Sequence, residues 1–98
     1  MSADAAGEAA RLHAVVLGFV QGVSFRYYTQ LKAESLGIVG WVRNRRDRSV
    51  EVTAEGTHPA LQALADFLKV GPPAAEVSDV QLAWQEPTGE FKSFDVRY

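Results

Sequence analysis

Two segments with helical periodicity, separated by segments with strand patterns, most constrain how this chain can fold. Apolar or small residues recur at spacings of three and four, as on one face of a helix, at Phe25, Thr29, Ala33 and Leu36 and again at Leu61, Leu64, Ala65 and Leu68. Ser24 and Thr57, which are residue types preferred at helix N-caps, precede the two stripes. Gly37 follows the first stripe as an expected C-terminal stop. The sequence therefore predicts two helices.

Five other segments have the composition of β-strands. Residues 11–19 are nearly apolar on both faces, which is typical of a central strand. Residues 38–45 and 50–55 predict a hairpin, and the alternation in 50–55 predicts that one face of that strand is solvated. Residues 80–84 and 94–98 predict a fourth strand and a short fifth. The order strand–helix–strand–strand–helix–strand, plus a terminal strand, indicates an α+β, ferredoxin-like sandwich in which two helices cover one face of an antiparallel sheet.

The size and composition of the chain indicate one ordinary globular domain. Its 98 residues suit a single domain, which we expect over 11–98 after an Ala/Gly-rich, flexible tail at 1–10. A net charge of -2 gives no general attraction to nucleic acid or to an anionic membrane, so neither is an expected partner. The absence of cysteine excludes disulfides, thiolate nucleophiles and cysteine-ligated zinc. With no signal peptide and no apolar span of 18 residues, we expect a cytoplasmic protein, and its size favours a monomer.

The most unusual stretch is residues 18–26, Gly-Phe-Val-Gln-Gly-Val-Ser-Phe-Arg, which joins the first strand to the first helix. Backbone N–H groups at a helix N-terminus are unpaired and favour anions, and Gly18 and Gly22 would let the backbone curl around one. Arg26 could turn its guanidinium over the same concavity, where its planar donors match phosphate oxygens. Glycine loops and solvated arginines at helix starts are also common, so the residues alone leave an anion site and an ordinary surface loop both open. The loop is neither a Walker A motif nor a dinucleotide-binding G-x-G-x-x-G.

Taken together, these residues resemble the acylphosphatase family. The similarity runs in colinear order over 11–98 and consists of Gly18-x-Val20-Gln21-Gly22-Val23-x-Phe25-Arg26, Thr29, Ala33, Leu36-Gly37-Ile38-x-Gly40-Trp41-Val42-x-Asn44, Asp47, Val50-Glu51, Gly56, Gly71-Pro72, Ala75, Val77 and Phe94-x-Val96-x-Tyr98. The resemblance implies a hydrolase that cleaves the carboxyl-phosphate bond of small acyl phosphates with a positioned water, and that uses no cofactor and no metal.

The resemblance also implies a role for particular residues. Arg26 would bind the phosphoryl group, and Asn44 would orient the attacking water. Backbone amides would complete the phosphate-binding loop at Val20, Gln21, Gly22, Val23, Ser24 and Phe25. The hydroxyl of Thr29 would support the loop or Asn44, and the alternative role for Thr29 is packing on the helix face. The two histidines, His13 and His58, are interpreted as structural.

One position departs from the family pattern. Asp47-Arg48 stands in the hairpin turn where Asp-Gly is usual, which predicts either another turn type or about 1 kcal/mol of local strain.

Two other functions compete with acyl phosphate hydrolysis. An acylphosphatase-like module that binds phosphate or another anion without catalysis would carry the same loop, although it would not need both Arg26 and Asn44. An RNA-recognition module would need aromatic residues on the first and third strands, and residues 12–17 and 50–55 contain no Phe, Tyr or Trp.

Overall fold

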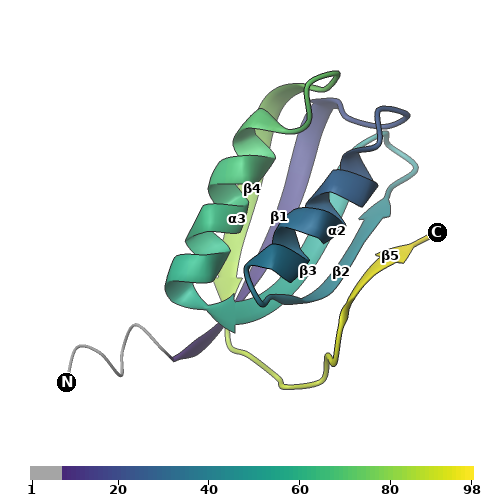
Figure 1. Ribbon diagram of the computed structural model, residues 1–98. Helices are drawn as coiled ribbons and strands as arrows, with labels where there is room; N and C mark the ends of the chain where they lie inside the picture. Colours follow the sequence, from purple (N-terminus) through teal and green to yellow (C-terminus); the bar gives the residue numbers. More distant parts are fainter. Residues whose placement is uncertain (1–7) are drawn as a thin grey trace.

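The structure, a computed structural model, describes residues 8–98 and forms a two-layer sandwich (Figure 1). Its elements in chain order are β1 (Ala9–Phe19), α2 (Phe25–Ser35), β2 (Val39–Asn44), β3 (Val50–Thr57), α3 (His58–Val70), β4 (Glu76–Gln85) and β5 (Phe94–Arg97). This is the order of elements that the sequence predicts, and most boundaries agree to within a few residues.

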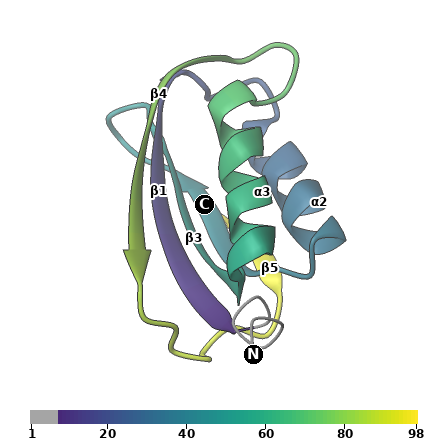
Figure 2. The same ribbon diagram turned by 90° about the vertical axis from the view of Figure 1, so that its left-hand side faces the viewer.

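The strands form one five-stranded sheet in the order β4-β1-β3-β2-β5, and both helices cover the same face of it (Figure 2). The first four strands pair antiparallel, so the predicted ferredoxin-like arrangement is confirmed for them. The short β5 differs, because it runs parallel to β2 and makes the sheet mixed. A long connection, residues 86–93, carries the chain from one edge of the sheet to the other, and this is why β5 arrives in the parallel direction.

The N-terminal boundary lies earlier than expected. Residues 1–7 of the predicted flexible tail, residues 1–10, lie outside the described part of the chain. Ala9 and Ala10, which we had placed in that tail, belong to β1 and pair with Thr57 and Gly56 of β3. Alanine has a low strand propensity, and here the pairing with a neighbouring strand overrides it.

The core lies between the helices and the sheet, as the apolar stripes predict. The buried residues of α2 are Phe25, Thr29 and Ala33, and those of α3 are Leu61, Leu64, Ala65 and Leu68. They pack against Leu12, Ala14 and Val16 of β1 and Val50, Val52 and Ala54 of β3. Burying a Leu or Phe side chain stabilises a fold by about 1.5–3 kcal/mol, so this layer holds the two helices in place.

The two predicted N-caps have different outcomes. Thr57 caps α3, because its hydroxyl accepts a hydrogen bond from the backbone N–H of Ala60 at 3.2 Å, and Pro59 lies in the first turn. Ser24 occupies the N-cap position of α2 but adopts a left-handed conformation with φ of 61°, and its side chain makes no cap hydrogen bond. The predicted N-cap position of Ser24 is therefore confirmed, but the capping hydrogen bond expected from its side chain is not formed.

The prediction of a solvated face on the third strand was wrong. Thr53 and Glu55 are only 3% and 5% exposed. The connection after β4 covers Glu55, whose carboxylate accepts hydrogen bonds from the backbone N–H groups of Thr88 at 2.8 Å and Gly89 at 3.0 Å. Burial raises the pKa of Glu55, but these bonds and one from Arg11 outweigh burial, so the pKa lies below its ordinary value. No local pattern in 50–55 could show a covering segment from residues 86–93.

The hairpin turn between β2 and β3 shows how Arg48 replaces the usual glycine. The backbone N–H of Arg48 donates to the Arg45 carbonyl at 3.1 Å, and the N–H of Arg45 donates to the Ser49 carbonyl at 2.9 Å. Arg48 itself has φ of 76°, the left-handed region that glycine tolerates best. This arrangement, a β-turn followed by a left-handed residue, is the one in which hairpins favour glycine. Of the two predicted alternatives, another turn type or local strain, the structure therefore shows the usual turn with a strained backbone at Arg48.

We predict that Arg48→Gly raises the free energy of unfolding by about 0.5–1 kcal/mol, since relief of the left-handed strain exceeds the added entropy of an unfolded glycine. Chemical denaturation would measure the change. Arg46→Gly is the matched control in the same turn, because Arg46 does not have a positive φ. This substitution relieves no strain, so it should lower the free energy of unfolding. Equal effects of the two substitutions would contradict a strained Arg48.

Candidate active site

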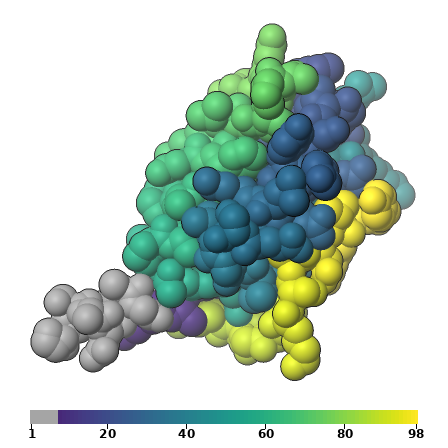
Figure 3. Space-filling model, viewed as in Figure 1, coloured from purple at the N-terminus to yellow at the C-terminus, as the bar shows by residue number. Residues whose placement is uncertain are grey.

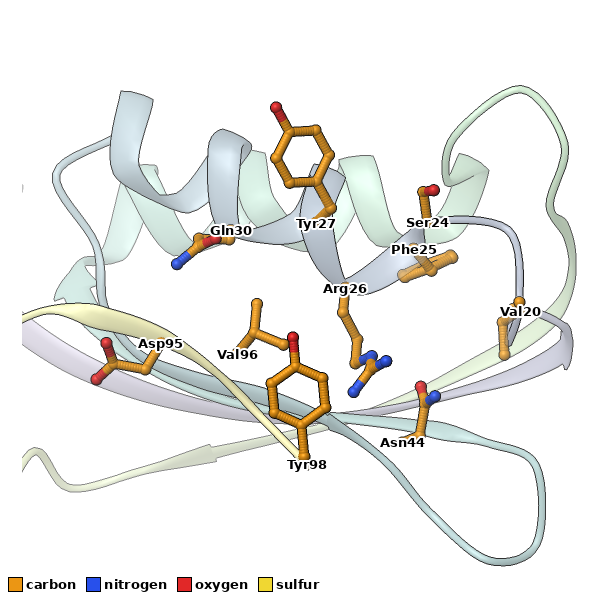
Figure 4. A pocket seen from close by; sticks show the side chains of 11 residues that line it. Val20, Ser24, Phe25, Arg26, Tyr27, Gln30, Asn44, Asp95, Val96 and Tyr98 are labelled. Atoms are coloured by element: carbon orange, nitrogen blue, oxygen red, sulfur yellow. The ribbon is translucent and has the colours of Figure 1, made fainter.

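A cavity of about 700 Å³ lies between α2 and the strands β2 and β5. It opens on the face where the blue surface of α2 adjoins the yellow surface of the C-terminal strand (Figure 3). The loop between β1 and α2 closes one end. Figure 4 shows the side chains that line it, with the helix above and the sheet below.

Arg26 enters the cavity from the first turn of α2. Its Nη1 donates to the backbone carbonyl of Arg97 at 3.2 Å, and its guanidinium carbon lies 4.7 Å from the centroid of the Tyr98 ring. Among the ion pairs between described residues, none uses Arg26. The guanidinium is thus oriented by a carbonyl and an aromatic face, while its charge has no carboxylate partner there.

The loop that closes the cavity is fixed at both ends by buried side chains. Val20 is 1% exposed and Phe25 is 2% exposed. Between them, Gly22 and Ser24 have positive φ values of 76° and 61°. No hydrogen bond between described residues uses a backbone N–H of residues 20–27 as donor, and the first amide of α2 with a backbone partner is that of Tyr28. Several amide donors therefore cluster unpaired at the N-terminus of α2, where the helix dipole adds partial positive charge.

The six predicted loop residues divide into two groups. Val20, Gly22, Ser24 and Phe25 line the cavity, whereas Gln21 and Val23 do not. Val23 packs against the core. Gly18, which we had expected to help the loop curl, lies inside β1 at a bulge, where an added Cβ would collide with the Glu76 carbonyl.

The side chain of Gln21 reaches across to the β2–β3 hairpin. Its Nε2 donates to two backbone carbonyls, that of Arg45 at 2.8 Å and that of Ser49 at 2.9 Å. These carbonyls stand on opposite sides of the turn, directly after β2 and directly before β3, where the N–H of Arg45 pairs with the Ser49 carbonyl. A single amide therefore ties the loop to both sides of the turn.

The same hairpin carries Asn44, the last residue of β2, into the cavity. The turn beyond it is braced by Asp47, whose Oδ1 accepts a hydrogen bond from the backbone N–H of Ser49 at 3.0 Å. The Ser49 hydroxyl also donates to this carboxylate and lowers the pKa of Asp47 below its ordinary value. These hydrogen bonds restrict the turn that follows Asn44 and so help to fix the position of this residue.

The structure brings the two principal predicted residues, Arg26 and Asn44, to one cavity. Figure 4 shows the Arg26 side chain descending from α2 and the Asn44 amide rising from β2, so that the two approach each other beside Val20. The residues are 18 positions apart in the sequence and come from different layers of the sandwich. An arrangement on opposite sides of the molecule would have ruled out a shared site.

Of the two roles considered for Thr29, the structure agrees with packing on the helix face. Thr29 is fully buried, and its Oγ1 has no hydrogen-bond partner among the described residues. The expected hydroxyl contact to the loop or to Asn44 is therefore not made in this structure. Thr29 instead contributes its methyl group to the buried face of α2.

Five further residues line the cavity and were not predicted: Tyr27, Gln30, Asp95, Val96 and Tyr98. The sequence could have indicated Gln30, because it lies one helical turn from Arg26 and therefore on the same face of the helix. It could not have indicated Asp95 and Val96, since their place in the cavity depends on the parallel pairing of β5 with β2. Asp95 lies at the end of the cavity away from Asn44 (Figure 4).

Both histidines lie outside the cavity, as a structural role requires. His13 Nε2 is 2.7 Å from Glu51 Oε2, and the ring of His58 stacks on Trp84 with centroids 4.3 Å apart. Within residues 8–98, no group of three or more His, Cys, Asp or Glu side chains could hold a metal ion. No helix in that range is long and apolar enough to cross a membrane.

Comparisons with known proteins agree on one family. The family model described as Acylphosphatase matches residues 12–96. A protein named Acylphosphatase from Pelotomaculum thermopropionicum is 49% identical over 89 residues, which cover 91% of this chain and 97% of the relative. One from Acaryochloris marina is 52% identical over 85 residues, covering 87% and 90%.

Solved structures give the same result. The crystal structure of acylphosphatase from Bacillus subtilis superimposes with a TM-score of 0.87 at 36% identity, covering 91% of this chain and 99% of that one. The structure of an acylphosphatase from Coxiella burnetii gives a TM-score of 0.86 at 37% identity, with coverages of 91% and 93%. With its loop, its Arg26 and its Asn44 gathered in one cavity, the chain belongs to the acylphosphatase family.

Proposed function

We propose that this acylphosphatase hydrolyses acyl phosphates by in-line attack of a water held by Asn44 on a phosphoryl group held by Arg26. The observation that carries the proposal is that Arg26, Asn44 and the unpaired amides of the loop line one cavity. The products are a carboxylate and inorganic phosphate. The monomeric state and the cytoplasmic location expected from the sequence stay predictions.

The loop and Arg26 supply the phosphate site. Unpaired N–H groups at a helix N-terminus bind phosphate oxygens, and a guanidinium adds two parallel charge-assisted hydrogen bonds. Arg26 is available for this role because no described carboxylate competes for it. Phosphate would replace weaker partners, the Arg97 carbonyl and the Tyr98 ring.

Asn44 supplies the position of the nucleophile. Its carboxamide has an oxygen that accepts a hydrogen bond from water and an NH₂ group that donates one. The water oxygen forms a bond to phosphorus as the bond from phosphorus to the acyl oxygen breaks, and the electron pair of that bond leaves with the carboxylate. The proton of the water passes to a phosphate oxygen. Since a carboxylate is a good leaving group, the reaction asks mainly for positioning and charge stabilisation rather than for a general acid.

A binding module without catalysis is the alternative, and turnover separates the two. We predict that the purified chain hydrolyses benzoyl phosphate in the presence of a chelator, because the named residues need no metal to bind phosphate and orient water. Release of inorganic phosphate would be the measurement. Tight binding of phosphate with no release from benzoyl phosphate would favour the binding module instead.

We predict that Arg26→Ala and Arg26→Lys both abolish competitive inhibition by inorganic phosphate together with turnover. Removal of the planar guanidinium takes away charge stabilisation worth about 10³–10⁵ in rate in other phosphoryl-transfer enzymes. Asn44→Ala is the matched comparison in the same cavity. It should keep the inhibition constant for phosphate and lose most of kcat, because it removes a contact made to the nucleophile. Unchanged phosphate inhibition in the Arg26 variants would refute the role of Arg26, and near wild-type turnover in Asn44→Ala would refute that of Asn44.

Gln21 acts as a positioning residue in this proposal, since its amide fixes the distance from the loop to the hairpin that carries Asn44. We predict that Gln21→Met, which keeps the size and removes both hydrogen bonds, lowers kcat by about 10- to 100-fold while phosphate still inhibits. Gln62→Met is the control, because Gln62 donates only to the exposed Asp66 on α3. A loss of stability in Gln21→Met without a fall in kcat would reduce Gln21 to a structural contact.

A further inference from the structure

A second cavity, which we call the side cavity, lies next to the first and has a volume of about 340 Å³. The two cavities share Gly22 and Ser24, so the loop forms a common rim between them. The remaining walls come from Val23, from Tyr28 of α2 and from the segment Pro72–Ala74 that follows α3. Its volume is within the range of about 300–1,000 Å³ typical of small-molecule sites.

The side cavity lies on the side of the loop away from Asn44. In Figure 4 the hairpin that carries Asn44 lies below the loop, and the segment after α3 lies above it. Figure 2 shows the same order, with the hairpin and the segment after α3 toward opposite sides of the molecule. The shared residue Ser24 stands on the upper rim of the first cavity.

This placement matches the direction in which a leaving group must depart. In phosphoryl transfer the attacking and leaving oxygens lie roughly in line on opposite sides of phosphorus. A water at Asn44 attacks from the sheet side, so the acyl oxygen points away from the sheet, toward Ser24. An acyl group attached to that oxygen extends over the rim toward Tyr28 and Pro73.

The walls of the side cavity determine which acyl groups fit. None of its residues carries a charge, and the accessible surface includes the ring of Tyr28, which is 43% exposed, and the exposed Pro73 and Ala74. The other end of the first cavity is more polar, with Gln30 and the carboxylate of Asp95. Uncharged walls disfavour a charged group, which would lose its hydration, and the exposed ring of Tyr28 offers an apolar face to an aromatic group.

We propose that the side cavity binds the acyl group of the substrate and thereby selects acyl phosphates whose acyl group is uncharged and can stack on an aromatic side chain, such as an aromatic ring. The inference rests on the proposed hydrolysis, because it takes the direction of the leaving group from the attack at Asn44. It assigns Tyr28, Val23 and Pro73 to substrate selection rather than to the chemical step.

The test compares kcat/KM for benzoyl phosphate and acetyl phosphate, which share the phosphoryl group and differ in the acyl group. Tyr28→Ser and Pro73→Ser should each lower the benzoyl-to-acetyl ratio, by about fivefold for the tyrosine, because they remove apolar contact with the ring. The value for acetyl phosphate should stay within about twofold of wild type. For the wild type, 4-carboxybenzoyl phosphate should be about tenfold poorer than benzoyl phosphate, since its added charge would meet no opposite charge among the walls and would lose hydration.

Two further variants serve as controls. Leu31→Ser alters another α2 side chain that is 43% exposed and lines neither cavity, so it should leave the ratio unchanged. Tyr27→Ser alters the first cavity instead. A fall in the ratio for Tyr27→Ser but not for Tyr28→Ser would place the acyl group along β5 and overturn the inference.

The outcomes also separate this inference from the proposed function. Hydrolysis of both substrates with an unchanged ratio in Tyr28→Ser and Pro73→Ser would overturn the side cavity as an acyl site and leave the hydrolysis standing. A wild-type chain that hydrolyses neither substrate would refute the hydrolysis itself, and the acyl site with it.

Discussion

The burial of Val20 and Phe25 at the two ends of one short loop is the constraint on which the site depends. Both side chains are almost completely removed from water and are part of the main core. The backbone between them belongs to no strand or helix, and it passes through left-handed conformations at Gly22 and Ser24. Its amides therefore stay unpaired, which costs stability, and burial of apolar side chains worth about 1.5–3 kcal/mol each offsets that cost. The core thus holds the loop in the open form that the proposed phosphate site requires.

The second half of the site is joined to the first through the sheet. Asn44 ends β2, which pairs with β3, and β3 pairs with β1, from which the loop begins. The Gln21 amide adds a direct connection from the loop to both sides of the hairpin turn. A site divided between two segments needs such a connection, because a displacement of about 1 Å between reacting groups can cost 100-fold in rate.

The sequence predicted the structure correctly wherever the relevant residues lie close together in the chain. The stripes of the two helices and the Thr57 cap depend on spacing and on residue type, and the structure agrees with them. The motif also pointed to Arg26 and Asn44, and both line the same cavity. The sequence was insufficient where distant segments meet. The burial of Glu55 depends on residues 86–93, and the lining by Asp95 depends on β5 pairing parallel to β2. Ser24 shows a third case, because a side chain with good cap chemistry cannot cap from a left-handed backbone.

Under the proposed function, the partners of Arg26 would explain how a bound phosphate is both held and released. A carboxylate beside the guanidinium would form a charge-assisted pair that phosphate must break, and it would repel the anion as well. The carbonyl of Arg97 and the ring of Tyr98 are weaker partners, and they restrict the long side chain without neutralising it. The arginine therefore loses little conformational entropy when phosphate binds, since it is already oriented. In the proposed mechanism, an open cavity whose described lining has Arg26 as its one cation would release inorganic phosphate between turnovers, which a deeper site with several cations would retain.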